Sequence, residues 1–236
     1  MNTLMQLHFG QAAELLVPSL MHGFGVVIQA TVLGFLLATI IGMIIAIGRL
    51  SSLKIIKGIL YVFLEIIRGT PLLVQLVYIY YVVPLLINLL ASLFGYKIDM
   101  QIAPLTAGIL GLGVNYGCYM SEVIRGAIIA VDSGQTEAAL VLGFGKYQAL
   151  FRIVIPQALR SIIPSLGNYL VMMVKDTSLL AYVAVNELLL RTQSFASQTF
   201  FTIESYTYLA LAYLVISIPL SHLVKFIEYK LKTNRR

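Results

Sequence analysis

The stretch that decides the fold is DSGQTEAALVLGFGKYQALFRIVIPQALR, residues 132–160, a polar segment between long apolar runs. Glu137 follows its start closely, and we expect this residue in the first helical turn, where the helix dipole favours an anion. The candidate capping residues are Asp132 and Ser133 at the start and Gly143 and Gly145 at the end. The pattern predicts a helix that is too polar for lipid and too short to stand alone, so it needs a protein partner on the water side.

The composition around this segment indicates an integral membrane protein. Apolar residues make up 59 % of the chain and charged residues 11 %, and the mean hydropathy is +0.92. Soluble domains are about half apolar and about one quarter charged. The net charge of +6 comes from basic residues at the edges of apolar runs, which indicates membrane topology and not nucleic-acid binding.

Apolar runs predict an all-α protein with about five transmembrane helices. No linker divides the chain, so we expect a single domain over residues 1–236, with the polar loop at about 132–156. The expected crossings are 20–47, 55–91, 102–129, 150–183 and 206–227.

The distribution of basic residues predicts the orientation. The clusters expected in the cytoplasm are 49–57, 146–160 and 225–236, and the segments expected outside are 92–101 and 184–205. The N-terminus is then outside and the C-terminus is inside.

The second apolar run, 55–91, is too long for one straight helix. Segments 49–57 and 132–148 share the cytoplasmic side only if an even number of crossings separates them, so 55–91 must cross once. A continuous helix at about 1.5 Å per residue would overshoot the bilayer. We therefore expect a bend or break near Pro71, with part of the run at the outer surface.

The polar loop resembles the EAA loop of importer permeases in the ATP-binding cassette (ABC) superfamily. That pattern is Glu-Ala-Ala, three residues, Gly, nine residues, Ile, two residues and Pro, and here Ile155 stands where Leu is usual. The matching residues are Glu137, Ala138, Ala139, Gly143, Ile153 and Pro156. The resemblance implies that Glu137, Ala138, Ala139, Gly143 and Pro156 couple the chain to an ATPase.

Three further stretches resemble the signatures of polar amino-acid permeases, and with the loop they cover roughly residues 20–230. They are RGTPLLVQ at 68–75, NYGCYMSEVIRG at 115–126 and KDTSLL at 175–180. Cys118 stands where the family usually has Ala. The resemblance implies the transmembrane subunit of a type I importer that moves polar amino acids across the bacterial cytoplasmic membrane.

The same resemblance implies the partners. Two permease subunits, identical or paralogous, enclose one path; two cytosolic ATPase subunits dock on the loop; and an external solute-binding protein delivers substrate. The chain has no phosphate-binding loop, so we expect ATP and Mg²⁺ on the ATPase partner. No cofactor, metal or nucleic acid is expected on this chain, and its three histidines lie far apart in the sequence.

Charges inside the apolar runs point to a path for a zwitterion. Such charges cost several kcal/mol, so they normally face a partner or a wet cavity. An amino acid needs an acceptor for its ammonium, which we expect from Asp176, and donors for its carboxylate, which we expect from Thr177, Ser178 and Arg68. The candidate path residues are Asp176, Thr177, Ser178, Lys175, Arg68, Thr70, Gln75 and Met172. The alternative is a structural ion-pair network of Lys175, Asp176 and Arg68.

Glu122 and Arg125 lie three residues apart on one predicted helix, so they can form a salt bridge for helix pairing or gating. Two other functional classes remain. An ATP-independent carrier or channel explains the intramembrane charges but leaves the polar loop without a partner. An intramembrane enzyme lacks any recognisable nucleophile or metal set.

Overall fold

The computed structural model describes residues 8–233, and every regular element in that range is helical. Arg235 and Arg236, part of the predicted C-terminal basic cluster, lie outside the described residues. The long elements are α1 (Phe9–Leu50), α2 (Lys54–Arg68), α5 (Pro104–Ile129), α8 (Ile155–Asp176) and α10 (Thr202–Thr233). The shorter α-helices are α3 (Leu72–Val77), α4 (Val83–Leu93), α6 (Ser133–Val141), α7 (Lys146–Ala149) and α9 (Leu188–Thr199). The π-helical turns η1 (Tyr78–Val82) and η2 (Leu150–Val154) and the 3₁₀ segment η3 (Thr177–Val183) continue α3, α7 and α8.

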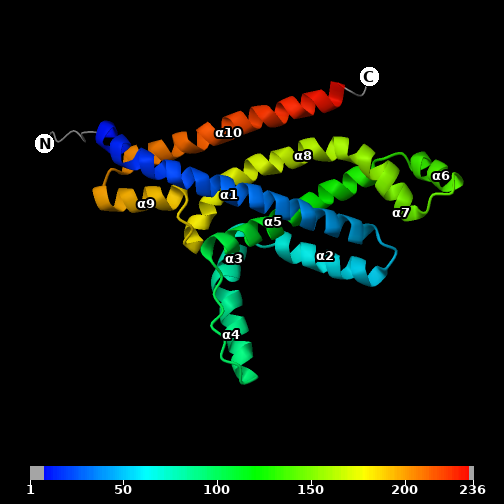
Figure 1. Cartoon of the computed structure of the whole chain (residues 1–236), viewed down its shortest axis with the longest axis horizontal. Helices are drawn as coiled ribbons and strands as arrows, with labels where there is room; N and C mark the ends of the chain where they lie inside the picture. The colour runs from blue at the N-terminus through cyan, green and yellow to red at the C-terminus, as the bar shows by residue number, and fades with distance from the viewer. Residues whose placement is uncertain (1–7, 234–236) are drawn as a thin grey trace.

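Most of the helices form one elongated bundle, from which α3 and α4 project (Figure 1). Figure 1 shows α6 and α7 at one end and α9 with the start of α1 at the other. Four described segments are long and apolar enough to cross a membrane, namely Phe9–Leu50, Leu72–Leu93, Lys146–Val183 and Thr202–Leu231. The remaining predicted crossing is α5, which is a 26-residue helix with half of its residues buried.

Helix α5 lies at the centre because α1 presents a stripe of small residues to it. These residues recur at every fourth position, as Ala30, Gly34, Ala38, Gly42 and Ala46, and all are buried. A Cβ on Gly42 would lie 3.1 Å from the carbonyl oxygen of Gly117, and a Cβ on Gly117 would lie 3.1 Å from that of Ala38. The two backbones therefore approach as closely as in small-residue pairs of membrane helices.

The predicted break near Pro71 is confirmed. Helix α2 ends at Arg68, and Pro71 precedes α3 with an extended backbone (φ −62°, ψ 142°). The amide of Gln75 holds the break: its Nε2 donates to the carbonyl oxygen of Ile67 (2.6 Å) and to both oxygens of Thr70 (3.0 and 2.9 Å). Figure 1 shows α3 and α4 leading steeply away from α2.

The polar segment after α5 folds as the short helix α6. Asp132 is its N-cap, because Oδ1 accepts a hydrogen bond from the backbone N–H of Gly134 (2.7 Å). Gly143 takes the left-handed conformation after the helix (φ +86°), whereas Gly145 is extended and precedes α7. The expectation for Glu137 is wrong: α6 begins at Ser133, so Glu137 is its fifth residue and lies beyond the first turn, where the dipole acts most strongly.

Helix α9 is anchored by a buried acid. Glu187 precedes it and accepts hydrogen bonds from the backbone N–H groups of Leu189 (2.8 Å) and Leu190 (2.9 Å) and from the hydroxyl of Tyr213 (3.0 Å). Burial raises the pKa of the Glu187 carboxyl above its usual range. This one side chain joins the start of α9 to α10.

Candidate functional site

A cavity of about 500 Å³ opens where the α2–α3 break meets α5 and α8. Four predicted path residues line it: Arg68, Thr70, Met172 and Asp176. Four other lining residues were not predicted as path residues: Asn115, Tyr116 and Tyr119, which belong to the 115–126 signature, and Tyr169. We call this space the central cavity.

Asp176 provides the negative charge of the central cavity. The hydroxyl of Tyr116 donates to its Oδ2 (2.7 Å). No salt bridge involves Asp176 within residues 8–233, so the structural network of Asp176 with Lys175 or Arg68, left open by the sequence, is not formed there. Within the described part of the chain, the carboxylate that faces the cavity therefore has one neutral donor and no cation.

Aromatic rings and one arginine form the other walls. The rings of Tyr116 and Tyr169 meet edge to face, with centroids 6.1 Å apart. The guanidinium of Arg68 lies over the ring of Tyr119 at 5.7 Å from its centroid. Because both contacts restrict the side chains, the cavity has a defined shape and a positive charge on the α2 side.

The other predicted path residues do not line the central cavity. The amide nitrogen of Gln75 is engaged at the α2–α3 break, and its Oε1 accepts from Asn115 (3.1 Å). The hydroxyls of Thr177 and Ser178 donate to the carbonyl oxygens of Val174 (2.6 Å) and Lys175 (2.9 Å) and so satisfy the end of α8. The side chain of Lys175 is exposed.

Glu122 forms the predicted salt bridge with Arg125 (3.4 Å), and two more arginines contact the same carboxylate. Its Oε1 accepts from Arg49 and from Arg68 (3.3 Å). One carboxylate thus ties α1, α2 and α5 together, and Arg68 links this cluster to the central cavity. The cluster has a surplus of positive charge.

The α6–α7 tip, residues 133–149, carries four of the predicted coupling residues, and the fifth, Pro156, is the second residue of α8. Glu137, Ala138, Gly143 and Pro156 are exposed, whereas Ala139 is buried beneath α6. Three large apolar side chains also face outward on this tip: Val141 is 88 % exposed, Leu142 75 % and Tyr147 76 %. Exposed apolar groups beside a polar helix are typical of a surface that another protein covers.

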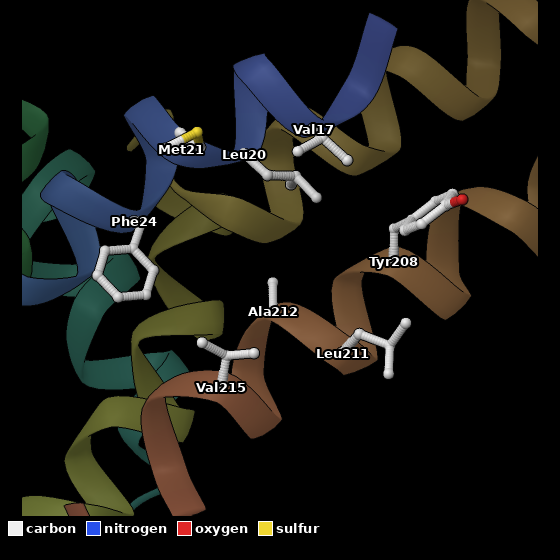
Figure 2. Close-up of a pocket in the computed structure, with 8 residues that line it drawn as sticks. All are labelled: Val17, Leu20, Met21, Phe24, Tyr208, Leu211, Ala212 and Val215. Carbon is white, nitrogen blue, oxygen red and sulfur yellow. The ribbon is translucent and has the colours of Figure 1, made fainter. Parts of the chain in front are cut away.

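A second hollow, between α1 and α10, has a different chemistry. It has a volume of about 380 Å³, and Figure 2 shows that apolar side chains from both helices face it. The one polar group among them, the hydroxyl of Tyr208, donates to the carbonyl oxygen of Phe9 (2.9 Å). This groove offers no charge to a polar solute.

Comparisons with known proteins agree with the fold and with the loop. The sequence model of the family described as "Binding-protein-dependent transport system inner membrane component" matches residues 38–233. The glutamine transport system permease protein GlnP of Escherichia coli (strain K12) is 32 % identical over 216 residues, which are 92 % of this chain and 94 % of that protein. The L-cystine transport system permease protein TcyB of Bacillus subtilis (strain 168) is 34 % identical over 215 residues, which are 91 % and 87 % of the two chains.

Solved structures give the same result. The crystal structure of an amino acid ABC transporter with histidines matches with a TM-score of 0.81 and 33 % identity, over 96 % of this chain and 100 % of that chain. An inward-facing form of the MetNI methionine ABC transporter, at 16 % identity, matches in fold alone, with a TM-score of 0.62 over 92 % and 98 % of the chains.

The helical bundle, the polar loop and the comparisons together define the class of protein, which is a multi-pass membrane subunit of a transporter. The chain belongs to the binding-protein-dependent transport system inner membrane components, among the permease subunits of amino-acid ABC importers. The ATPase of such a transporter is a separate subunit, as the sequence predicts. The carrier and enzyme alternatives are therefore wrong.

Proposed function

We propose that the central cavity holds a polar amino acid during import, with the α-ammonium at Asp176. The observation that carries this proposal is a carboxylate inside the bundle that has a tyrosine donor but no cation among residues 8–233. A charge at membrane depth needs a partner, and a substrate ammonium supplies one.

The remaining walls suit the rest of an amino acid. Arg68 borders the cavity and can donate to the α-carboxylate, while Tyr119, Tyr169 and Met172 surround the side chain. The relatives are named for glutamine and cystine, and the solved transporter was crystallised with histidines, so we infer a polar amino acid. The segments around the cavity are held by hydrogen bonds from Gln75, Thr177 and Ser178, which do not line it. Lys175 also lies outside it.

For the transport cycle, we infer that the α6–α7 tip docks on the ATPase. Two permease subunits, identical or paralogous, enclose the path, and an extracytoplasmic solute-binding protein delivers the amino acid. ATP and Mg²⁺ bind to the two ATPase subunits. Their closure draws the two tips together and biases the bundle between inward-open and outward-open states, with Glu122 and Arg125 as part of the gate.

The proposed orientation places the N-terminus outside and the α6–α7 tip in the cytoplasm. In a Cys118→Ala background, Ser194→Cys should react with an impermeant reagent in intact cells, and Ser133→Cys only after permeabilisation. Both residues are exposed and lie on α9 and α6, at opposite ends of the bundle. Labelling of both positions from one side would contradict this orientation.

The variant Asp176→Asn tests the substrate site. If the substrate ammonium is the partner, the apo complex should melt at nearly the wild-type temperature, because no protein cation loses its counter-ion. Stabilisation by L-glutamine or L-histidine should weaken, and uptake should fall at least about tenfold. Melting of the solubilised complex with and without amino acid, together with uptake in vesicles, measures all three.

Asp99→Asn is the matched control, because Asp99 is an exposed carboxylate outside the cavity, and its Oδ2 accepts a hydrogen bond from Gln101 (3.3 Å). This control should match wild type in every measurement. Wild-type uptake and unchanged amino-acid stabilisation in Asp176→Asn would show that Asp176 does not bind the substrate.

A further inference from the structure

A second polar cavity, of about 300 Å³, lies at the α6 end of the bundle. It is an open hollow bordered by the last turn of α5, the N-cap of α6 and the first turns of α8, and its polar lining residues are exposed. Its charged and polar lining residues are Asp132, Gln157, Arg160 and Ser161, and alanine and valine side chains complete its surface. We call it the end cavity. It shares no lining residue with the central cavity.

The polar groups of the end cavity have free hydrogen-bonding capacity. Within residues 8–233, the guanidinium of Arg160 forms no hydrogen bond or salt bridge, and the hydroxyl of Ser161 forms no hydrogen bond. Asp132 uses Oδ1 for the cap of α6, so Oδ2 remains available. Gln157 donates from Nε2 to Gln135 on α6 (3.2 Å), and its carbonyl oxygen remains available.

Opposite charges on the lining indicate what this cavity recognises. A free phosphate or a lipid phosphate would suit Arg160 but would be repelled by Asp132. A zwitterion satisfies both, since its ammonium needs an acceptor and its carboxylate needs donors. A cavity of this volume is at the small end of ligand sites, which suits one small molecule.

We propose that the end cavity binds a free amino acid from the cytoplasm, with the α-ammonium at Asp132 and the α-carboxylate at Arg160 and Ser161. The substrate class and the cytoplasmic side both rest on the proposed function. The bound amino acid bridges Asp132, which caps α6, to Arg160 on α8. It therefore restrains the coupling helix relative to α8 and slows import as the product accumulates inside.

The number of bound amino acids tests the site. Equilibrium binding of radiolabelled L-glutamine and L-histidine is measured on the solubilised permease–ATPase complex, without ATP or solute-binding protein. Wild type should bind two molecules per permease subunit. Arg160→Gln and Asp176→Asn should each bind one, because each variant loses a different site.

Two further variants control for general effects. Arg152→Gln changes another exposed arginine of the same region that does not line the end cavity, and it should still bind two molecules. Asp132→Asn keeps a good N-cap on α6 but removes the charge, so affinity at the end cavity should fall about tenfold. Loss of a site in Arg152→Gln as well would overturn the assignment to Arg160.

The outcomes separate this inference from the proposed function. One molecule per wild-type subunit, lost in Asp176→Asn and kept in Arg160→Gln, overturns the end cavity and leaves the central cavity standing. Two molecules in both wild type and Asp176→Asn, with one in Arg160→Gln, supports the end cavity and contradicts the assignment of Asp176. Binding of inorganic phosphate to the Arg160 site with no amino acid bound there also overturns the inference.

Transport gives a second readout. In proteoliposomes loaded with increasing internal L-glutamine, wild-type uptake should slow several-fold, and Arg160→Gln should keep its rate. Uptake into empty proteoliposomes should be the same for both proteins. Equal slowing in both proteins would show that product inhibition does not act through the end cavity.

Discussion

The central cavity and the α6–α7 tip differ from their surroundings in polarity, and they do so in opposite ways. In the central cavity a carboxylate and an arginine lie within an apolar bundle. On the tip, Val141, Leu142 and Tyr147 face outward from a polar segment. Each region carries groups that are unusual in its environment, and the kind of group indicates the kind of partner. Polar groups inside call for a small polar ligand, and apolar groups outside call for a protein surface.

The largest expected effect is at the tip. Glu137→Lys should abolish uptake and ATPase binding while the chain inserts normally, because Glu137 is exposed on a helix with no role inside the membrane. Pull-down of the ATPase and uptake in vesicles measure both. Gln198→Lys, an exposed residue of α9 at the other end, is the control. Normal uptake in Glu137→Lys would show that Glu137 on the tip is not needed for docking of the ATPase.

Arg68→Ala should have the next largest effect. It removes the positive wall of the central cavity, and uptake should fall by about tenfold or more. The complex should remain assembled, since Glu122 keeps Arg49 and Arg125 as partners. Arg68→Lys should recover only part of the rate, because a lysine lacks the planar fork. Full activity in Arg68→Ala would mean that the substrate carboxylate binds elsewhere.

Tyr116→Phe should have a moderate effect. The change deletes one hydroxyl, whose hydrogen bond to Asp176 is worth about 1 kcal/mol, so amino-acid affinity should fall roughly fivefold. Titration of the solubilised complex with L-glutamine or L-histidine measures this. Tyr206→Phe, which removes the hydroxyl of an exposed tyrosine on α10 outside the central cavity, is the control. An unchanged affinity in Tyr116→Phe would show that this hydroxyl does not help to hold Asp176 for the substrate.

The groove between α1 and α10 gives the smallest effect. Leu211→Ala should leave uptake within about twofold of wild type, because the side chain is half exposed and its removal leaves no enclosed void. Uptake normalised to the amount of assembled complex measures this. A loss as large as that of Arg68→Ala would mean that an apolar hollow matters to transport as much as the charged one does.

Sequence reasoning succeeded where the chemistry is local. Asp132 caps the start of α6 and Gly143 follows its end, as expected, and Pro71 marks the break after α2. These features were predictable because caps and turns depend on residues a few positions apart. The position of Glu137 was wrong by one turn, since the dipole argument depends on the exact first residue of the helix.

The central cavity was only partly predictable because its contacts are distant in sequence. Tyr116 and Asp176 are 60 residues apart, and no local pattern joins them. One sequence signal for these cavity residues was available: Asn115, Tyr116 and Tyr119 carry hydrogen-bonding groups within an apolar run. Gln75 shows the opposite case, because its polarity serves the chain break at Thr70 and the contact with Asn115.

The small-residue stripe on α1 also bears on how the protein is made. Helix α1 is long and apolar enough to cross a membrane, whereas α5 is not among the described segments that meet the same criterion of length and composition. The ribosome delivers α1 first, so its stripe is already in the bilayer when α5 emerges. Close packing against Ala38 and Gly42 then retains α5 there. We therefore expect the order of synthesis to matter for this permease, with α1 as the surface on which the helix that carries Tyr116 is retained.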